Sequence, residues 1–340
     1  MKAVRIDEPG KLVVVDVEEP KIENPTQVKI KVTSGSICGS DLGIYKGTNS
    51  LATYPCIIGH EYGGEVVEVG SMVKNVKPGD LVAVDPVRVC GHCYACRHGH
   101  QNVCSTLEVT GVHRSGGYAN YVIAPGDRVY KVDAKLIPPD LVCLVEPYSI
   151  AVEVNHRART AKNDRVLVMG SGPIGLCIMQ DAKARGALVM TTDIVDSRLK
   201  LAKEMGADVT VNVNKTDLRK AVDEFTDGEG MPVVVDAICS LTSFPMALDM
   251  TCPAARVVVL GLLSKPSEVA QVSITKKELD VLGSRLSNRR FGEVIESWQN
   301  GFYTPAKIRS HTFHFTEAQK AFDLVLGHPD QVVKVSLNFD

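Results

Sequence analysis

The sequence has little of several features that mark whole classes of protein. Aromatic residues make up 5% of its 340 positions, tryptophan occurs once, and the formal net charge is only −2. Such a balance leaves no basic field for nucleic acid or for an anionic membrane surface, so we expect neither partner. No window approaches the roughly 18 consecutive apolar residues of a membrane span. Charged residues interrupt the apolar runs at the N-terminus, so no secretory signal is expected either.

The remaining composition describes an ordinary globular protein. Hydrophobic residues make up 44% of the chain, which is long enough for two domains and a large core. We therefore expect a cytoplasmic protein whose partner is a small molecule. In that compartment thiols stay reduced, so clustered cysteines indicate metal ligands or catalytic groups rather than disulfides.

Four of the ten cysteines occur in the stretch "CGHCYACRHGHQNVC". Their spacing, C-x2-C-x2-C-x7-C, suits tetrahedral Zn²⁺, because short spacers let neighbouring thiolates turn toward one ion. The alternative is an iron–sulfur cluster, but the ferredoxin pattern C-x2-C-x2-C-x3-C-P differs at the last spacer, and Ser105 stands in place of the proline. A closed four-thiolate site has no open position for substrate, so we predict a structural zinc. Its ligands are Cys90, Cys93, Cys96 and Cys104.

A second constellation offers an open metal site. The stretches "ICGSDLGIYKG", "YPCIIGHEYGGEVVEVG" and "LVEPYSIA" contain one cysteine, one histidine and two carboxylates of interest. One thiolate, one imidazole and one carboxylate are the ligand types of a catalytic zinc that leaves one place for water or substrate. The residues are Cys38, His60, Glu61 and Glu146.

The middle of the chain carries a dinucleotide-binding pattern. In "DRVLVMGSGPIGLCIMQDAKARGALVMTTDIVDSRLK" a buried apolar strand, a glycine-rich turn, a helix and a second strand follow one another. The second strand ends at Asp193, which is placed to accept hydrogen bonds from the adenosine ribose and to repel a 2′-phosphate, so NAD is favoured over NADP. Arg198 either flanks the adenine or belongs to an amphipathic helix. The expected cofactor-binding residues are Gly170, Gly172, Pro173, Ile174, Gly175, Asp193, Arg198 and Arg285.

These patterns predict an α/β architecture: a Rossmann doubly wound parallel sheet beside a β-rich domain. The stretches "MPVVVDAI" and "ARVVVLGLL" resemble further buried parallel strands, with breaks at Ser240 and at Ser264 to Pro266, whereas "QVKIKV" alternates as a half-buried strand does. We expect a catalytic domain with the zinc lobe over 1–151, an NAD-binding domain over 152–286, and a tail over 287–340 that returns to the catalytic domain.

On these residues the chain resembles the zinc-containing medium-chain alcohol dehydrogenase family. The glycine pattern from Gly59 to Val73 resembles that family's zinc signature, and the four clustered cysteines resemble its structural-zinc lobe. Glu146 followed by Pro147 resembles the sorbitol and threonine dehydrogenase branch. The segments "VDPVRVCGHCYAC", "TLEVTGVHRSGGYANYV" and "GSRLSNRRF" are similar to the subgroup of the starvation-sensing oxidoreductase RspB and the sugar-acid 5-dehydrogenases.

The resemblance implies a GroES-like catalytic domain, two zinc ions per chain, NAD, and a homodimer or homotetramer. It implies that either Glu61 or Glu146 approaches the catalytic metal while the other acts through water. It also implies that Ser40 begins a proton relay from the substrate hydroxyl. Relatives have a histidine three residues later, where this chain has Gly43, so water or another group such as Tyr45 completes the relay, or the relay is damaged.

The resemblance leaves several substrates open. A sugar acid needs a cation for its carboxylate, and the polar residues suited to that role are His113, Arg114, Arg285, Asn288, Arg289 and Arg290. They favour an NAD-dependent dehydrogenase that oxidises an aldonate such as L-gulonate, L-idonate or L-galactonate at C5. A polyol such as sorbitol or xylitol and L-threonine are the alternative substrates. The alternative of another class is an NAD-binding regulatory protein with little turnover, suggested by Gly43.

Overall fold

The structure, a computed structural model, describes residues 1–263 and 265–339. The chain divides into two units. Unit 1 comprises residues 1–146, 291–300 and 308–340, and unit 2 comprises residues 147–290 and 301–307. Ser264, at the start of the break expected between 264 and 266, lies outside the described residues. No helix in the described ranges has the length and apolar character needed to cross a membrane.

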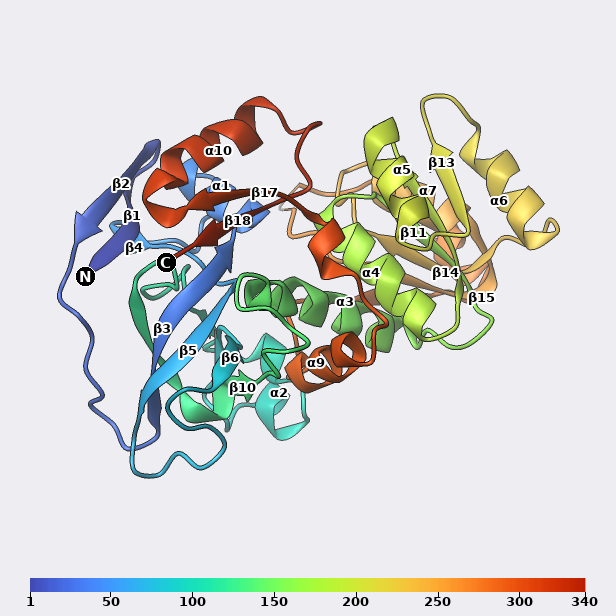
Figure 1. The fold of residues 1–340 in the computed structure, drawn as a ribbon. Helices are drawn as coiled ribbons and strands as arrows, with labels where there is room; N and C mark the ends of the chain where they lie inside the picture. Colours follow the sequence, from blue (N-terminus) through green and yellow to red (C-terminus); the bar gives the residue numbers. More distant parts are fainter. Residues whose placement is uncertain (264, 340) are drawn as a thin grey trace. The chain divides into compact units, whose positions relative to one another are not determined.

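Unit 1 is built from a mixed sheet of seven strands, coloured blue, green and red in Figure 1. Its strand order is β10-β6-β5-β3-β18-β17, and β9 also pairs with β3. The strands are β3 (Gln27–Ser36), β5 (Tyr62–Val69), β6 (Leu81–Val84), β9 (Tyr121–Pro125), β10 (Val129–Lys131), β17 (Arg309–His314) and β18 (Lys334–Asn338). The two strands from the end of the chain pair parallel with each other, and β18 pairs antiparallel with β3. Residues some 300 positions apart therefore share one sheet.

Smaller elements complete unit 1. A three-stranded sheet contains β2 (Lys11–Asp16), β1 (Lys2–Glu8) and β4 (Cys56–Ile57), and a two-stranded antiparallel sheet contains β7 (Val87–Arg88) and β8 (Glu108–Val109). The α-helices are α1 (Gly39–Tyr45), α2 (Tyr94–Arg97), α9 (Phe291–Gln299) and α10 (Ala318–Gly327). Short 3₁₀ turns occur at Gln101–Val103, Gly126–Arg128, Val142–Leu144 and Phe315–Glu317. Helix α3 (Val145–Ala158) begins in unit 1 and continues in unit 2.

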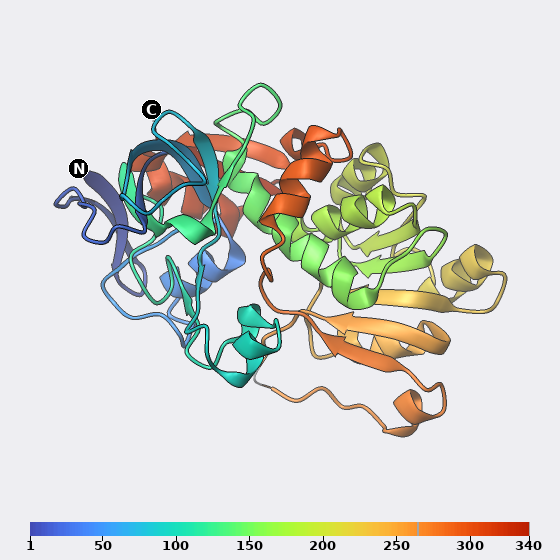
Figure 2. The same cartoon turned by 90° about the horizontal axis from the view of Figure 1, so that it is seen from below.

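Unit 2 contains a parallel sheet of six strands in the order β13-β12-β11-β14-β15-β16. In Figure 2 the orange strands of this sheet, which are the last two strands of unit 2 in chain order, form one edge of the sheet. The strands are β11 (Arg165–Met169), β12 (Leu188–Asp193), β13 (Val209–Asn212), β14 (Met231–Asp236), β15 (Thr251–Val259) and β16 (Asp280–Gly283). The helices are α4 (Pro173–Ala184), α5 (Asp196–Glu204), α6 (Leu218–Thr226), α7 (Ser243–Asp249) and α8 (Val272–Thr275), with a 3₁₀ turn at Pro305–Lys307.

The central strands of unit 2 are apolar because both faces of the sheet are covered. Helices α4 and α5 pack on β11, β12 and β13, and α7 packs on β14 and β15 (Figure 1). Leu167, Met190 and Val234 are fully buried in the resulting core. This sheet order is that of the doubly wound fold, which binds nucleotides outside the carboxyl ends of its strands. The predicted fold class is confirmed: an α/β dinucleotide-binding sheet accompanies a β-rich unit.

Candidate zinc and dinucleotide sites

The first candidate site lies in unit 1, where three ligand atoms converge. Cys38 is the N-cap of α1, just after β3, while His60 and Glu61 directly precede β5. The Cys38 sulfur, a His60 ring nitrogen and a Glu61 carboxylate oxygen all lie within 4.8 Å of one another. His60 and Glu61 are buried, and Cys38 is half-buried. A compact thiolate, imidazole and carboxylate set of this kind suits zinc with one open position.

Asp41 lies beside two of these ligands in the first turn of α1. Its side chain is fully buried, Oδ2 accepts a hydrogen bond from the Cys38 backbone N–H at 2.9 Å, and Oδ1 lies 3.5 Å from His60 Nδ1. Burial alone would lower the pKa of His60, but the charges of Asp41 and Cys38 raise it well above its ordinary value. A carboxylate behind a metal-binding imidazole fixes the ring and strengthens it as a ligand. The surroundings of His60 therefore favour a cation.

The Glu61 carboxylate also forms an ion pair with a lysine from the C-terminal part of the chain. Lys334 Nζ, on β18, lies 2.7 Å from Oε1 and 2.5 Å from Oε2, and the Ser36 hydroxyl donates a hydrogen bond to Oε2. All three side chains are buried. Pairing of β18 with β3, in which Ser336 lies opposite Ser36, brings Lys334 to this position. A zinc ion bound by Glu61 would therefore compete with Lys334 for the same carboxylate.

Glu146 is the second carboxylate near this cluster. It lies in the first turn of α3 and is buried. Burial, and next the negative charge of Glu61, raise the pKa of Glu146 to about 8, while His60 and Lys334 act in the opposite direction. Glu146 is thus electrostatically coupled to the cluster, although it is not in the group of ligand atoms within 4.8 Å. A buried carboxylate beside a second one is stabilised when a cation arrives.

The second candidate site is the cysteine lobe. The sulfur atoms of its four cysteines lie within 4.8 Å of one another, with Cys93 to Cys104 at 3.9 Å and Cys104 to Cys90 at 3.5 Å. Tetrahedral thiolates about 2.3 Å from a zinc ion stand roughly 3.8 Å apart. The backbone N–H groups of Cys90 and Cys93 donate to Cys104 and Cys90 sulfur, each at 3.3 Å. Hydrogen bonds from the Ser105 and Cys96 backbone lower the pKa of Cys93 to about 5. This donor set fits a structural zinc.

The dinucleotide pattern folds in unit 2 as its glycines require. Gly170, after β11, has φ +100°, and Gly172 is the N-cap of α4, with Pro173 as the first helical residue. A Cβ atom on Gly175 would lie 1.9 Å from the Gly170 carbonyl oxygen, so only glycine allows the helix and strand to approach this closely.

Asp193 ends β12 and faces the same turn. Its Oδ2 accepts from the Ser171 N–H at 2.9 Å, and its Oδ1 accepts from the Ile194 and Val195 N–H groups at 2.8 and 3.0 Å. Arg198 Nη1 lies 3.9 Å from Asp193 Oδ2. The N-terminus of α4 supplies N–H groups and a positive dipole end for phosphate. Expected cofactor residues from 170 to 198 therefore lie together at one end of the sheet.

The expected substrate residues fall in two places. His113, whose Nδ1 accepts from the Val109 N–H at 3.1 Å, lines a cavity of unit 1 with Arg114. In unit 2, Arg285, Asn288 and Arg289 follow β16 in an irregular segment with positive φ at Leu286 (+51°) and Arg289 (+61°). The neighbouring Arg290 is a different case, because its Nε lies 2.9 Å from Glu153 and forms a partly buried ion pair.

Asp41, Ser36 and Lys334 are site residues that the sequence patterns did not indicate. Asp41 had a local signal, since it lies three residues after Cys38 and next to Ser40 in one short helix. Lys334 had none, because it is 273 residues from Glu61 in the chain.

Known proteins resemble this chain over nearly its whole length. The model of the alcohol dehydrogenase GroES-like domain matches residues 24–134, and that of the zinc-binding dehydrogenase matches residues 173–300. The starvation-sensing protein RspB of Escherichia coli K12 is 39% identical over 100% of this chain and 99% of its own length. L-threonine 3-dehydrogenase of Pyrococcus abyssi is 38% identical over 93% of this chain and 92% of its own. D-arabitol-phosphate dehydrogenase of Enterococcus avium is 33% identical over 99% and 98%.

Solved structures show the same relationship. RspB of E. coli CFT073, crystallised with the cofactor NADH, superposes with a TM-score of 0.94 at 39% identity and covers 100% of this chain and 99% of its own. L-idonate 5-dehydrogenase of E. coli K-12 has a TM-score of 0.89 at 26% identity over 99% and 98%. The chain therefore belongs to the zinc-type medium-chain alcohol dehydrogenase family. It is an enzyme of the dehydrogenase class whose cofactors are zinc and a nicotinamide dinucleotide.

Proposed function

We propose that the chain is an NAD-dependent zinc dehydrogenase that oxidises a secondary alcohol of a sugar acid, an aldonate such as L-gulonate, L-idonate or L-galactonate at C5. The observation that carries the reaction class is the convergence of Cys38, His60 and a carboxylate within 4.8 Å in a chain that also has a complete dinucleotide fold. When bound, zinc supplies Lewis-acid stabilisation of the substrate oxygen, and nicotinamide accepts the hydride.

In this proposal different residues of the chain bind the two zinc ions and transfer the proton. Cys38, His60 and either Glu61 or Glu146 hold the catalytic zinc, and the four clustered cysteines hold the structural one. The Ser40 hydroxyl lies 3.3 Å from His60 Nε2, beside a ligand atom, so it can accept the proton of a substrate hydroxyl and donate its own onward. Asp41 keeps His60 in the orientation that this role needs.

The onward path from Ser40 passes Gly43, which has no side chain to carry a proton. A Cβ atom there would meet Asn49 and Thr48 at ordinary contact distances of 3.6 Å, so no steric conflict excludes a side chain at this position. Tyr45, the other expected carrier, accepts a hydrogen bond from Gln319 Nε2 at 3.3 Å and packs against Phe322. We therefore propose that water, rather than a side chain, receives the proton from Ser40.

The preference for NAD rests on Asp193. A carboxylate at the end of the second strand accepts hydrogen bonds from a ribose diol and repels a 2′-phosphate. Three backbone N–H groups fix its orientation. Arg198 offsets part of its charge at 3.9 Å, which moderates the discrimination against NADP.

The substrate class rests on the segment after β16 and on the similarity to L-idonate 5-dehydrogenase, whose name specifies a sugar acid as substrate. Arginine suits bidentate recognition of a carboxylate, and Arg285 and Arg289 supply two such groups. Left-handed backbone at non-glycine residues such as Leu286 and Arg289 persists where surrounding structure imposes it, often at binding sites.

A polyol is the second candidate substrate, favoured by the similarity to D-arabitol-phosphate dehydrogenase, which spans 99% of the chain. L-threonine is represented among the relatives as well. A regulatory protein with little turnover remains the alternative of another class. We also propose a cytoplasmic location, because none of the ten cysteines forms a disulfide, and a homodimer or homotetramer.

The test is NADH formation, followed at its absorbance, by zinc-loaded protein with L-gulonate, L-idonate, L-galactonate, D-sorbitol, xylitol and L-threonine. Turnover confined to the aldonates supports the proposal, and turnover confined to sorbitol, xylitol or threonine replaces the substrate class. No turnover by protein that still binds NADH would favour the regulatory alternative. The variant Arg289→Gln should raise KM for an aldonate and leave KM for NAD unchanged. The variant Arg114→Gln tests the other group of expected substrate residues and should leave KM for the aldonate unchanged, because the proposal assigns the substrate to the segment after β16.

A further inference from the structure

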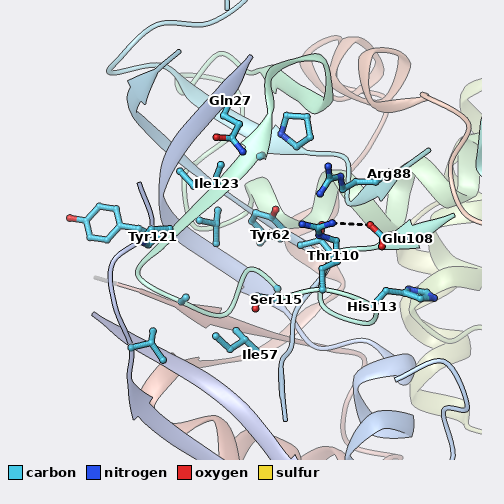
Figure 3. A pocket seen from close by; sticks show the side chains of 18 of the residues that line it. Gln27, Ile57, Tyr62, Arg88, Glu108, Thr110, His113, Ser115, Tyr121 and Ile123 are labelled. Carbon is cyan, nitrogen blue, oxygen red and sulfur yellow. Dashed lines mark hydrogen bonds and ion pairs between the residues drawn. The ribbon is translucent and has the colours of Figure 1, made fainter. Parts of the chain in front are cut away.

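Unit 1 contains a cavity of about 760 Å³ that includes none of the zinc-ligand candidates and none of the residues of the segment after β16 to which we assign the substrate. Its walls come from β3 and β9, from the paired strands β7 and β8, and from the segment between β8 and β9 (Figure 3). Among the described residues that line it, none is Cys38, His60, Glu61 or Glu146. Its volume lies in the range of about 300–1,000 Å³ that is typical of small-molecule sites.

One side of the cavity carries two guanidinium groups and a carboxylate. Arg114 Nη1 lies 3.1 Å from Glu108 Oε2, and both side chains are nearly half exposed (49% and 43%). Arg88, at the end of β7, is exposed and forms no ion pair with any residue in the ranges 1–263 and 265–339. Figure 3 shows Arg88 and Glu108 on the same side of the cavity, with Thr110 beside them. A guanidinium group in this position is available to a ligand's oxyanion.

Acceptors for hydroxyl groups lie in the same cavity. Glu108 and Glu18 both line it, and a carboxylate accepts hydrogen bonds from several hydroxyls at once. Glu18 is exposed and forms no ion pair within the described part of the chain. An inorganic anion would be stabilised only by its ion pair with Arg88. A hydroxylated anion would be stabilised by that ion pair and also by hydrogen bonds from its hydroxyls to the carboxylates. The mixed charges therefore select for a ligand that carries both kinds of group.

Tyr62 supplies an independent observation. Its side chain is only 2% exposed, yet it lines the cavity, in the middle of the side chains drawn in Figure 3. Its hydroxyl forms no hydrogen bond with any residue that the structure describes, and this oxygen is not one of the fully enclosed polar atoms without a partner, so water or a ligand can reach it. A hydroxyl that has no partner in the protein and remains accessible normally forms its hydrogen bond with water or a ligand. Burial and the charge of Asp85 raise the pKa of Tyr62, so this hydroxyl is a donor at neutral pH.

We propose that this cavity is a second, non-catalytic binding site for a small polyhydroxy molecule that carries one oxyanion, a carboxylate or a phosphate. Arg88 pairs with the oxyanion, Glu108 accepts hydrogen bonds from ligand hydroxyls, and the Tyr62 hydroxyl donates to the ligand from the floor of the cavity. Because no zinc-ligand candidate lines the cavity, occupation of this site does not require the catalytic zinc.

Isothermal titration calorimetry on the full zinc-loaded chain tests this site with three probes. D-gluconate and glycerol 2-phosphate carry hydroxyls with a carboxylate or a phosphate, and acetate carries a carboxylate alone. We expect one of the two hydroxylated probes to bind more tightly than acetate, and the tighter one identifies the oxyanion. Arg88→Gln should weaken that binding about 10- to 100-fold, as expected for a lost charge-assisted hydrogen bond.

Three further variants distinguish binding in this cavity from binding at the zinc centre and from attraction by surface charge. Tyr62→Phe keeps the buried ring and should weaken binding about 3- to 10-fold by removing only the hydroxyl. Lys135→Gln removes one exposed positive charge of unit 1 outside the cavity and should leave binding unchanged. Cys38→Ser should also retain it, because the site does not involve the catalytic zinc.

Several results would overturn the proposal without affecting the proposed dehydrogenase activity. Loss of binding in Cys38→Ser would place the ligand at the zinc centre. Equal weakening by Lys135→Gln and Arg88→Gln would mean that bulk charge alone attracts the probe. Equal affinity for acetate and gluconate would show that the hydroxyl acceptors have no role, and absence of binding by all three probes would refute the site itself.

Discussion

Replacing Lys334 by methionine should destabilise unit 1 strongly. Lys334 is 3% exposed and Glu61 is 1% exposed, and their charged atoms are 2.5 Å apart. At that distance, with the effective dielectric constant of about 20 that suits partly buried pairs, the attraction is about 6–7 kcal/mol. Removing one partner leaves the Glu61 charge buried beside Glu146, and such losses typically amount to about 3–5 kcal/mol of unfolding free energy.

The chain offers a local probe for this measurement. Its single tryptophan, Trp298 in α9, is 7% exposed and belongs to unit 1, so its fluorescence during urea denaturation reports that unit. The double variant Glu61→Gln/Lys334→Met removes both charges and should be more stable than Lys334→Met alone by about 2 kcal/mol or more. Lys135→Gln should change the unfolding free energy by less than about 0.5 kcal/mol. A loss below about 1 kcal/mol in Lys334→Met, or no recovery in the double variant, would refute the reasoning.

Other predictions concern the metals and the cofactor. Cys38→Ser should abolish NADH formation, reduce the zinc content from two to one and leave NADH binding unchanged; surviving activity would contradict the zinc assignment. Cys93→Ser should lower the thermal midpoint and release the other zinc, so an unchanged midpoint with both zinc ions retained would contradict its structural role. Asp193→Ala should weaken NAD about 10- to 100-fold and NADP far less, and equal losses would contradict the ribose assignment. Glu146→Gln should lower the affinity for the catalytic zinc more than Glu61→Gln does, as metal titration with a competing chelator would show.

Local patterns predicted those parts of the molecule whose geometry depends on nearby residues. The glycines from 170 to 175 specify a turn that only a strand followed by a helix can use, and both elements are present. The short spacers between Cys90, Cys93 and Cys96 restrict the directions in which their sulfur atoms can point, and the three sulfurs converge. In each case the chain between the functional residues is too short to separate them.

Contacts between distant segments could not be predicted in this way. No sequence pattern connects Glu61 with Lys334, because their contact depends on β18 pairing with β3 after some 300 intervening residues. The β15 strand is also displaced from its apolar run "ARVVVLGLL": it begins earlier, at Thr251, passes through an irregular register that includes Ala254 at φ +60°, and ends at Val259, before the run does. Tertiary packing, rather than hydrophobic periodicity, determines that part of the strand.

The contacts of the two carboxylates differ in a way that bears on which of them, Glu61 or Glu146, we propose as the third zinc ligand. Glu61 already forms an ion pair with Lys334 and accepts a hydrogen bond from the Ser36 hydroxyl. Coordinating a metal ion would weaken both of these interactions. Glu146 is buried and lies near a second negative charge, which is why its pKa rises to about 8. A bound divalent cation offsets both the cost of burying the ionised Glu146 and its repulsion by the neighbouring carboxylate. It therefore stabilises ionised Glu146 more than it stabilises Glu61. We therefore propose that Glu146 rather than Glu61 is the third zinc ligand, because Glu61 is held in an ion pair with Lys334 on the C-terminal strand.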